Sequence, residues 1–235
     1  MKKRIVSLLL TLAMLMGMLV LPTAAVNASP GNRIDDSQVD SMLAAYNQVF
    51  NTMGSNSKDS MPLGNGTMAA NVWVEDGGDL VIYLSRPDSY SEAARLLKIG
   101  RVRISAQYED GTNVFASGSA FPQKLVLEEA TLYITVGSGN HKTVFKVWID
   151  RATDAMEIEA VSSDPVKLTV KNDLWRTEEL VMNKSNERSF IGVRENCKDD
   201  IPRESADVIA SSKGDDHLLW YHRNEYSRYE KMVAH

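Results

Sequence analysis

The sequence predicts an all-β fold, a large antiparallel β-sandwich of two sheets with few short helices. Three observations indicate it: short apolar or alternating segments recur along the chain, turn residues separate them at regular spacing, and hardly any long segment has helical periodicity. Many short strands joined by such turns are typical of sandwiches.

The segment before the first expected strand allows two interpretations. From Val39 onward apolar residues recur at a helical spacing, but Tyr46–Phe50 also alternates as a strand does. We favour a short helix that ends near Ala45, followed by a strand over 46–50. Asn51–Asp59 is rich in Ser, Asn and Gly and predicts a loop.

The remaining strands follow in order, and turn residues join several of them. Glu75–Asp79 and Gly137–Asn140 predict hairpin turns. The acidic run 75–79 also suggests a calcium loop, but it lacks the ligand spacing of a known motif, so we favour the hairpin. Ser85–Ala94 predicts a polar connection and Thr177–Ala206 an irregular excursion. The expected strands are Met68–Val74, Leu80–Leu84, Ile99–Ser105, Gln123–Leu127, Thr131–Val136, Thr143–Ile149, Met156–Val161, Val166–Val170 and His217–His222.

The stretch from 59 to 74 reads D-S-M-P-L-G-N-G-T-M-A-A-N-V-W-V and predicts a turn of fixed shape before a strand. Pro62 fixes its own φ, and Gly64 and Gly66 allow backbone angles that other residues avoid. An ordinary tight turn is the alternative. We expect Asn65 and Gly66 to face a partner domain or its substrate, so that Asn65→Ala leaves the thermal midpoint nearly unchanged.

The N-terminus has the pattern of an export signal. Lys2, Lys3 and Arg4 precede the apolar run 5–21, and Val26-Asn27-Ala28 offers small residues for cleavage. We expect residues 1–28 to be a cleaved signal peptide, the protein to be secreted, and no stable membrane span to remain; a retained anchor is the alternative. Residues 29–45 then form a leader, 46–222 the sandwich domain and 223–235 the beginning of a linker.

The expected mature chain is acidic and has no disulfide. Removing 28 of 235 residues leaves 207, enough for one domain with its own core, and removing three positive charges changes the net charge from −5 to −8. Nucleic-acid binding needs a basic footprint and is therefore not expected. The single cysteine, Cys197, cannot form an intramolecular disulfide and has no nearby His at a metal-ligand spacing, so no metal or other cofactor is predicted.

No catalytic residue can be chosen from the sequence. Adjacent carboxylates on a strand point to opposite faces, so acidic doublets do not form the pair that glycoside hydrolysis needs. The histidines have no metal-ligand spacing, and no Gly-x-Ser-x-Gly or phosphate-binding loop occurs. The acidic doublets are Glu128-Glu129, Glu178-Glu179, Asp199-Asp200 and Asp215-Asp216.

Aromatic and polar residues at strand ends are the candidate contacts. Trp73, Trp148 and Trp220 lie in expected strands and are predicted to fill the core. Trp175 follows a strand end and is predicted to be exposed, where an indole offers a flat face to a sugar ring. The polar candidates for contact with carbohydrate or another domain are Asp88, His222, Arg223 and Asn224; for the last three, hydrogen bonds that fix the linker are the alternative.

Four runs of this sequence resemble a known family. They are the stretch 59–74, then G-D-L-V-I-Y-L-S-R-P-D-S-Y, R-L-L-K-I-G-R-V-R-I and W-Y-H-R-N-E-Y-S. Together they resemble the bacterial domain of unknown function 5703, from Tyr46 to about Ser227. The P-L-G-N-G run is similar, more distantly, to the N-terminal β-sandwich of glycoside hydrolase family 95, the α-L-fucosidase group. The family often has an acidic residue where Thr67 stands, which puts a polar contact from that position in doubt.

The resemblance implies a supersandwich-like domain that precedes a helical (α/α) barrel carrying the catalytic carboxylates. The chain ends at His235, where a linker to such a barrel is expected, so it would be a fragment without the catalytic machinery. We therefore expect an exported, non-catalytic module of a glycoside-hydrolase-like protein that supports or contacts carbohydrate. A stand-alone glycan hydrolase and a structural spacer without ligand are the alternatives.

Overall fold

The structure is a computed structural model that describes residues 35–91, 95–115, 121–138, 141–181, 203–210 and 217–224. The chain divides into one unit that ends at Val39 and a second that begins at Asp40 and contains every strand described below. The expected signal peptide and residues 225–235 of the expected linker lie outside the described residues. Within the ranges given above, no helix is long and apolar enough to cross a membrane.

The second unit is built from antiparallel strands. A helix, α2 (Asp36–Ala44), precedes β1 and begins three residues before the predicted Val39. The strands are β1 (Gln48–Phe50), β2 (Met61–Gly64), β3 (Ala69–Val74), β4 (Asp79–Tyr90), β5 (Leu96–Tyr108), β6 (Gln123–Val126), β7 (Thr131–Ser138), β8 (His141–Ile149), β9 (Met156–Ser162), β10 (Val166–Asn172), β11 (Leu180–Val181), β12 (Arg203–Glu204), β13 (Asp207–Ala210) and β14 (Leu219–His222).

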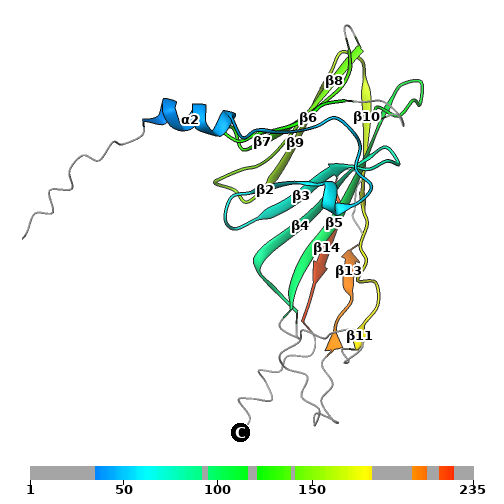
Figure 1. The fold of residues 1–235 in the computed structure, drawn as a ribbon. Helices are drawn as coiled ribbons and strands as arrows, with labels where there is room; N and C mark the ends of the chain where they lie inside the picture. The colour runs from blue at the N-terminus through cyan, green and yellow to red at the C-terminus, as the bar shows by residue number, and fades with distance from the viewer. Residues whose placement is uncertain are drawn as a thin grey trace, which may run out of the picture. The chain divides into compact units, whose positions relative to one another are not determined.

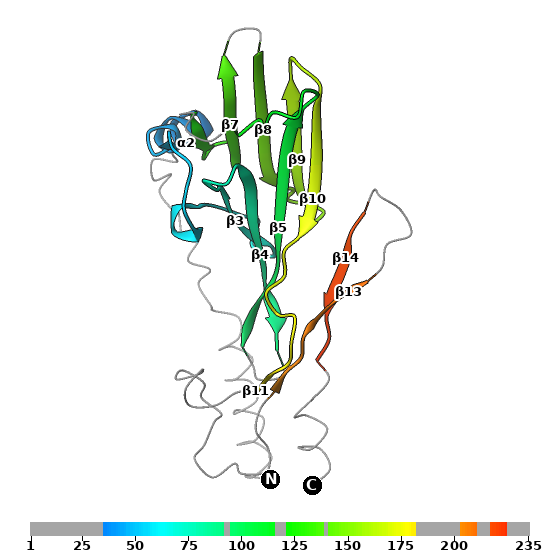
Figure 2. The same ribbon diagram turned by 90° about the vertical axis from the view of Figure 1, so that its right-hand side faces the viewer.

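Two five-stranded sheets form the sandwich (Figures 1 and 2). One has the strand order β1-β6-β7-β8-β9 and the other β10-β5-β4-β3-β2, and every pairing in both is antiparallel. Neighbours in sequence pair through hairpins in most cases, for example β7 with β8. The predicted all-β sandwich is confirmed.

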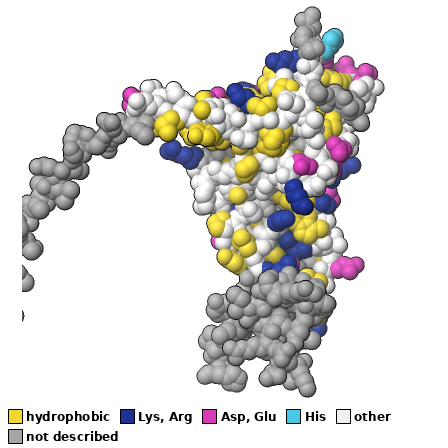
Figure 3. Space-filling view, in the orientation of Figure 1, with side chains coloured by type: hydrophobic (Ala, Val, Ile, Leu, Met, Phe, Trp, Pro, Cys, Tyr) yellow, Lys and Arg dark blue, Asp and Glu magenta, His cyan; other side chains and the backbone are white. Residues whose placement is uncertain are grey.

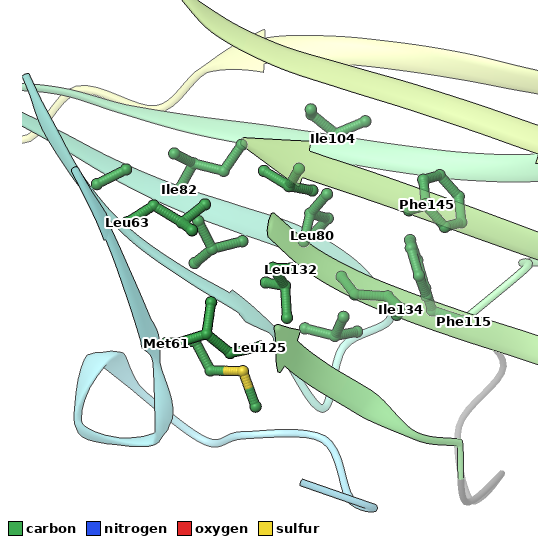
Figure 4. Packing of buried hydrophobic residues seen from close by; sticks show 14 of the residues in the cluster. Met61, Leu63, Leu80, Ile82, Ile104, Phe115, Leu125, Leu132, Ile134 and Phe145 are labelled. Carbon is green, nitrogen blue, oxygen red and sulfur yellow. The ribbon is translucent and has the colours of Figure 1, made fainter. Parts of the chain in front are cut away.

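The core lies between the inner faces of the two sheets (Figure 4). Alternate residues of each strand point inward, so that Leu80 and Ile82 of β4 meet Leu132 and Ile134 of β7. Phe115 and Phe145 stack at 4.9 Å between ring centroids and are fully buried. Burying each such side chain contributes about 1.5–3 kcal/mol, so this layer stabilises the sandwich.

The strands β4 and β5 are longer than the sequence predicts. Residues 85–90 extend β4, although Ser85–Ala94 was expected to be a connection. A second correction concerns β13, for which the sequence predicted no strand and which pairs with β14. Both views show this hairpin beside the lower part of β5 (Figures 1 and 2). The Trp220 indole donates a hydrogen bond of 2.7 Å to the carbonyl of Ile99 and fixes the hairpin to β5.

The stretch around Pro62 is a strand rather than a turn. Pro62 and Gly64 belong to β2, which pairs with β3, and the turn begins only at Asn65. The prediction that Pro62 and Gly64 shape the loop is therefore corrected. β2 is the edge of its sheet, the position where a proline without an N–H donor is tolerated.

The positions of the tryptophans relative to the core differ in part from the prediction. Trp73 is buried, at 2% exposed, but it alternates with Val72 and Val74 and so lies on the outer face of its sheet, not in the intersheet core. Trp148 and Trp220 are half-buried and outside the core cluster, which corrects their prediction as core residues. Trp175 is 40% exposed, as predicted.

Candidate functional site

The side chain of Asn65 is fully engaged within the domain. Its amide nitrogen donates to the carbonyl of Asp150 at 3.0 Å and to Asp154 at 2.8 Å, across the sandwich in the β8–β9 turn. Its oxygen accepts from the backbone N–H groups of Thr67 and Met68 at 3.0 and 2.8 Å. Both donors of the amide are used, so the side chain acts as a clamp between the two sheets. These bonds argue against the expectation that Asn65→Ala leaves the thermal midpoint unchanged.

Charged residues extend this clamp toward β4. Thr67 and then Asn65 hydrogen-bond Asp154 and lower the pKa of its carboxyl, and Arg86 lies 3.5 Å from it. Arg86 also pairs with Asp88 at 3.1 Å, and its hydrogen bond lowers the pKa of Asp88. Gly66 has a φ of 99°, which favours glycine there. The sequence put a polar contact from Thr67 in doubt, but its hydroxyl group donates a hydrogen bond to Asp154.

A row of three aromatic rings lies on the outer face of the sheet that contains β2, β3, β4, β5 and β10. Trp73 packs edge-on against Tyr83 at 4.8 Å, and Tyr83 packs against Trp175 at 5.3 Å. Lys98 Nζ lies 4.7 Å from the Tyr83 ring, and the Arg101 guanidinium carbon lies 5.3 Å from the Trp175 ring. Cations over aromatic faces hold such rings in place. Trp175 is thus a fixed, partly exposed indole at the end of the row.

Trp175 lines a cleft of about 500 Å³, which we call the platform cleft. Most of its charges are paired: Arg95 contacts Glu204 at 3.0 Å, and Arg203 contacts Glu179. In contrast, the side chains of Lys98 and Glu178 make no ion pair or hydrogen bond with the described residues, and the Lys98 ammonium contacts only the Tyr83 and Trp175 rings. In Figure 3, Lys and Arg side chains lie next to hydrophobic ones on the lower part of the described surface. The platform cleft thus combines a flat apolar face with one cation and one anion available for hydrogen bonding.

Asp173 holds Arg101, one of the cations that lie over the Trp175 ring. Its carboxylate accepts from Arg101 at 2.8 Å and from Arg103 at 3.2 Å. Partial burial alone would raise the pKa of Asp173, but the hydrogen bonds and charges of the two arginines outweigh it and lower the pKa. Arg103 also contacts Glu75 at 2.5 Å and Asp79 at 3.2 Å. The hairpin turn 75–79 predicted from the sequence therefore supplies charges to this outer face.

A second cleft of about 590 Å³ lies where β14 meets the ends of β4 and β5, and we call it the hairpin cleft. It brings together four residues predicted from the sequence. They are Asp88, His222, Arg223 and Asn224. Asn65 and Gly66 do not line either cleft, and Trp175 lines only the platform cleft.

A network of contacts around the buried side chain of Asp207 fixes the hairpin cleft. The Asp207 side chain, 2% exposed, contacts Arg176 at 2.9 Å and His222 Nδ1 at 3.0 Å. His222 Nε2 lies 3.1 Å from the Asn224 oxygen, and Asn224 donates to the carbonyl of Tyr90 at 3.0 Å. Hydrogen bonds thus fix His222 and Asn224, two of the three residues to which the alternative applied, and leave Arg223 aside.

Sequence reasoning missed Asp207 and Arg176. Arg176 follows Trp175, and Asp207 begins β13, a strand whose apolar run V-I-A is too short to be predicted. Among the residues that the structure describes, no group of three or more His, Cys, Asp and Glu side chains is placed to hold a metal ion.

The comparisons with known proteins give one result. A search of the curated proteins finds no match. The family model described as "Domain of unknown function (DUF5703)" matches residues 49–235, a range that includes all of both sheets except Gln48, the β13–β14 hairpin and both clefts. Because that match extends over far more than half of the sequence, the chain belongs to the family of domain of unknown function 5703.

Proposed function

We propose that this protein is a non-catalytic β-sandwich module that contacts carbohydrate through the platform cleft. The observation that carries the proposal is the exposed indole of Trp175, held by Tyr83 and Arg101. Beside it lie Lys98 and Glu178, whose side chains make no ion pair or hydrogen bond with the residues that the structure describes. A sugar ring has an apolar face and a rim of hydroxyl groups. Aromatic residues with a few polar groups at their edge suit such a ligand.

The available charges favour a neutral sugar. Lys98 can donate hydrogen bonds to ring oxygens, and Glu178 can accept them from hydroxyl groups. One uncommitted charge of each sign gives the platform cleft no net preference for an ion. Arg95 and Glu204 neutralise each other and form part of its wall.

The module is proposed to be exported by its N-terminal signal and to belong to a glycoside-hydrolase-like protein whose helical domain carries the catalysis. The support is the sequence pattern of residues 1–28 and the resemblance of the P-L-G-N-G run to the sandwich of glycoside hydrolase family 95. Neither cleft is assigned a catalytic residue in this proposal. Hydrolysis of a glycan by the purified protein, abolished by one carboxylate substitution, would favour the stand-alone enzyme instead.

The test compares sugar binding by the protein and by variants of Trp175. A glycan array first selects neutral oligosaccharides, and calorimetry then measures their affinity. Trp175→Ala is expected to weaken binding about 5- to 30-fold, because losing an aromatic contact costs roughly 1–2 kcal/mol. Trp175→Phe should retain most of the affinity.

Tyr46 provides the control for exposed aromatic residues. It is 69% exposed and outside both clefts, so Tyr46→Ala should leave binding unchanged. Equal affinity of the protein and Trp175→Ala for every sugar bound would contradict the platform cleft as the site. A complete lack of binding would favour the structural spacer.

A further inference from the structure

We propose that the hairpin cleft is a separate subsite for an acidic sugar, a pyranose ring that carries a carboxylate, with Arg223 as the partner of that carboxylate. The proposal rests on the proposed function in taking the ligand to be carbohydrate. It concerns a different cleft, however, and names the charge of the ligand. None of the three aromatic residues beside the platform cleft, Trp73, Tyr83 and Trp175, lines the hairpin cleft.

The charges that line the hairpin cleft leave one cation uncommitted. Asp88 is held by Arg86 at 3.1 and 3.4 Å. Asp207, which does not line the cleft, is held by Arg176 and His222. Arg223 is exposed and makes no hydrogen bond or ion pair with any residue in the described ranges. A guanidinium matches a carboxylate with two parallel hydrogen bonds, so an anionic group is the partner that Arg223 fits best.

Two tyrosines give the cleft the chemistry of a sugar site. Tyr90 of β4 is 51% exposed and Tyr221 of β14 is 46% exposed. Within the part of the chain that is described, neither hydroxyl group has a hydrogen-bond partner. Leu97, 5% exposed, and Ile99 add apolar surface. Apolar rings with free hydroxyl groups suit a ring that is itself apolar on its faces and hydroxylated at its rim.

The backbone that carries Arg223 is already fixed. On one side His222 lies between Asp207 and the Asn224 oxygen, and on the other Asn224 donates to the carbonyl of Tyr90. Binding therefore needs little ordering beyond the Arg223 side chain, which lowers its entropic cost.

The two clefts differ in the charges that are available to a ligand, and this difference predicts which sugar each cleft binds. The platform cleft has both Lys98 and Glu178 available, whereas the hairpin cleft has Arg223 and no uncommitted carboxylate among its described lining residues. The two clefts share Leu97 and Arg176 as lining residues. A neutral and an acidic sugar should therefore select different clefts of the same protein.

The test follows the indole N–H signals of the protein by NMR during titrations. The sequence has four tryptophans, so each signal can be assigned by a Trp→Phe substitution, with Trp220 reporting on the hairpin cleft and Trp175 on the platform cleft. Sodium glucuronate should shift the Trp220 signal with saturation. Benzoate, which has the carboxylate and an apolar ring but no ring hydroxyl groups, should shift it much more weakly.

Arg223→Gln should weaken glucuronate binding about tenfold or more, as expected for the loss of charge-assisted hydrogen bonds. The matched control is Arg151→Gln, an exposed arginine of the β8–β9 turn outside both clefts, which should change nothing. Raising the salt concentration should weaken the binding of glucuronate.

Trp175→Ala separates this proposal from the platform cleft. If glucuronate still shifts Trp220 in that variant, the acidic subsite stands whether or not neutral sugars bind at Trp175. Three results would overturn it: glucuronate shifts only Trp175 or no indole, benzoate binds as tightly as glucuronate, or Arg223→Gln leaves the affinity unchanged.

Discussion

Asn65 joins residues that are distant in sequence but adjacent in the sandwich. Its donors reach Asp150 and Asp154, 85 and 89 positions away, while its oxygen closes the turn before β3. The run P-L-G-N-G made this residue conspicuous in the sequence. Its role could not be predicted from that run, because the partners belong to the turn between β8 and β9 and only the packing of the two sheets brings them near.

The thermal midpoint of Asn65→Ala should fall. The variant loses the two hydrogen bonds that the amide donates to Asp150 and Asp154, and it leaves the N–H groups of Thr67 and Met68 without their acceptor. This loss should lower the free energy of unfolding by about 1–3 kcal/mol. For a domain of this size that corresponds to a drop of roughly 2–12 °C, measurable by circular dichroism. Asn71→Ala is the control, because exposed Asn71 makes one side-chain bond, to Ser60. Equal midpoints for both variants would contradict the clamp.

Asp173 should make part of the stability sensitive to acid. Its pKa in the folded protein is below the ordinary value of 3.8, because the arginines outweigh the effect of partial burial. A lowered folded pKa means that the stabilisation is present above the unfolded pKa and is lost as pH falls through the folded one. Between about pH 6 and about pH 3 the urea midpoint should therefore fall more steeply for the wild type than for Asp173→Asn.

The control for this prediction is Asp76→Asn, since Asp76 is an exposed turn residue whose carboxylate makes no ion pair within the described ranges. It should keep the pH dependence of the wild type. If Asp173→Asn kept the same slope as well, the pairs with Arg101 and Arg103 would contribute nothing to folding.

At the level of elements, alternation predicted the strands whose inner faces form the core. β7 and β8 alternate core and outer residues, so their centres were predictable from the sequence. The end of β4 was not, because S-R-P-D-S has the composition of a turn, although this segment forms a strand. β13 was missed because its four residues are stabilised by Arg176 and by pairing with β14, contacts that no local pattern encodes.

Gly100 should be required for docking of the β13–β14 hairpin. A Cβ at this position would lie 2.8 Å from the Trp220 indole nitrogen, whereas the backbone of Gly100 does not have a positive φ and tolerates alanine. Gly100→Ala should therefore displace Trp220 from Ile99 and speed hydrogen exchange of its indole N–H at least tenfold. The core signals of Phe145 and Leu132 should stay in place.

Gly77→Ala is the matched control, because a Cβ there meets nothing within 4 Å. It should leave the Trp220 signal unchanged. Unchanged exchange in Gly100→Ala would mean that the hairpin is not held against β5 through this indole.

Considered as a whole, the second unit is a sandwich whose core is a cluster of buried hydrophobic residues from both sheets. Membership of the family of domain of unknown function 5703 and the all-β fold could both be reached from sequence patterns. The clefts could be predicted only in part: 222–224 and Trp175 were identified individually, but their grouping depends on how the hairpin docks.

The most direct test of a carbohydrate-contacting module is an NMR titration of the protein with neutral oligosaccharides, read at the four indole N–H signals. We expect at least one sugar to shift the Trp175 signal with saturation at millimolar concentration, while the signals of Trp73 and Trp148 stay fixed. No shift of Trp175 with any sugar, or equal shifts at all four indoles, would contradict it.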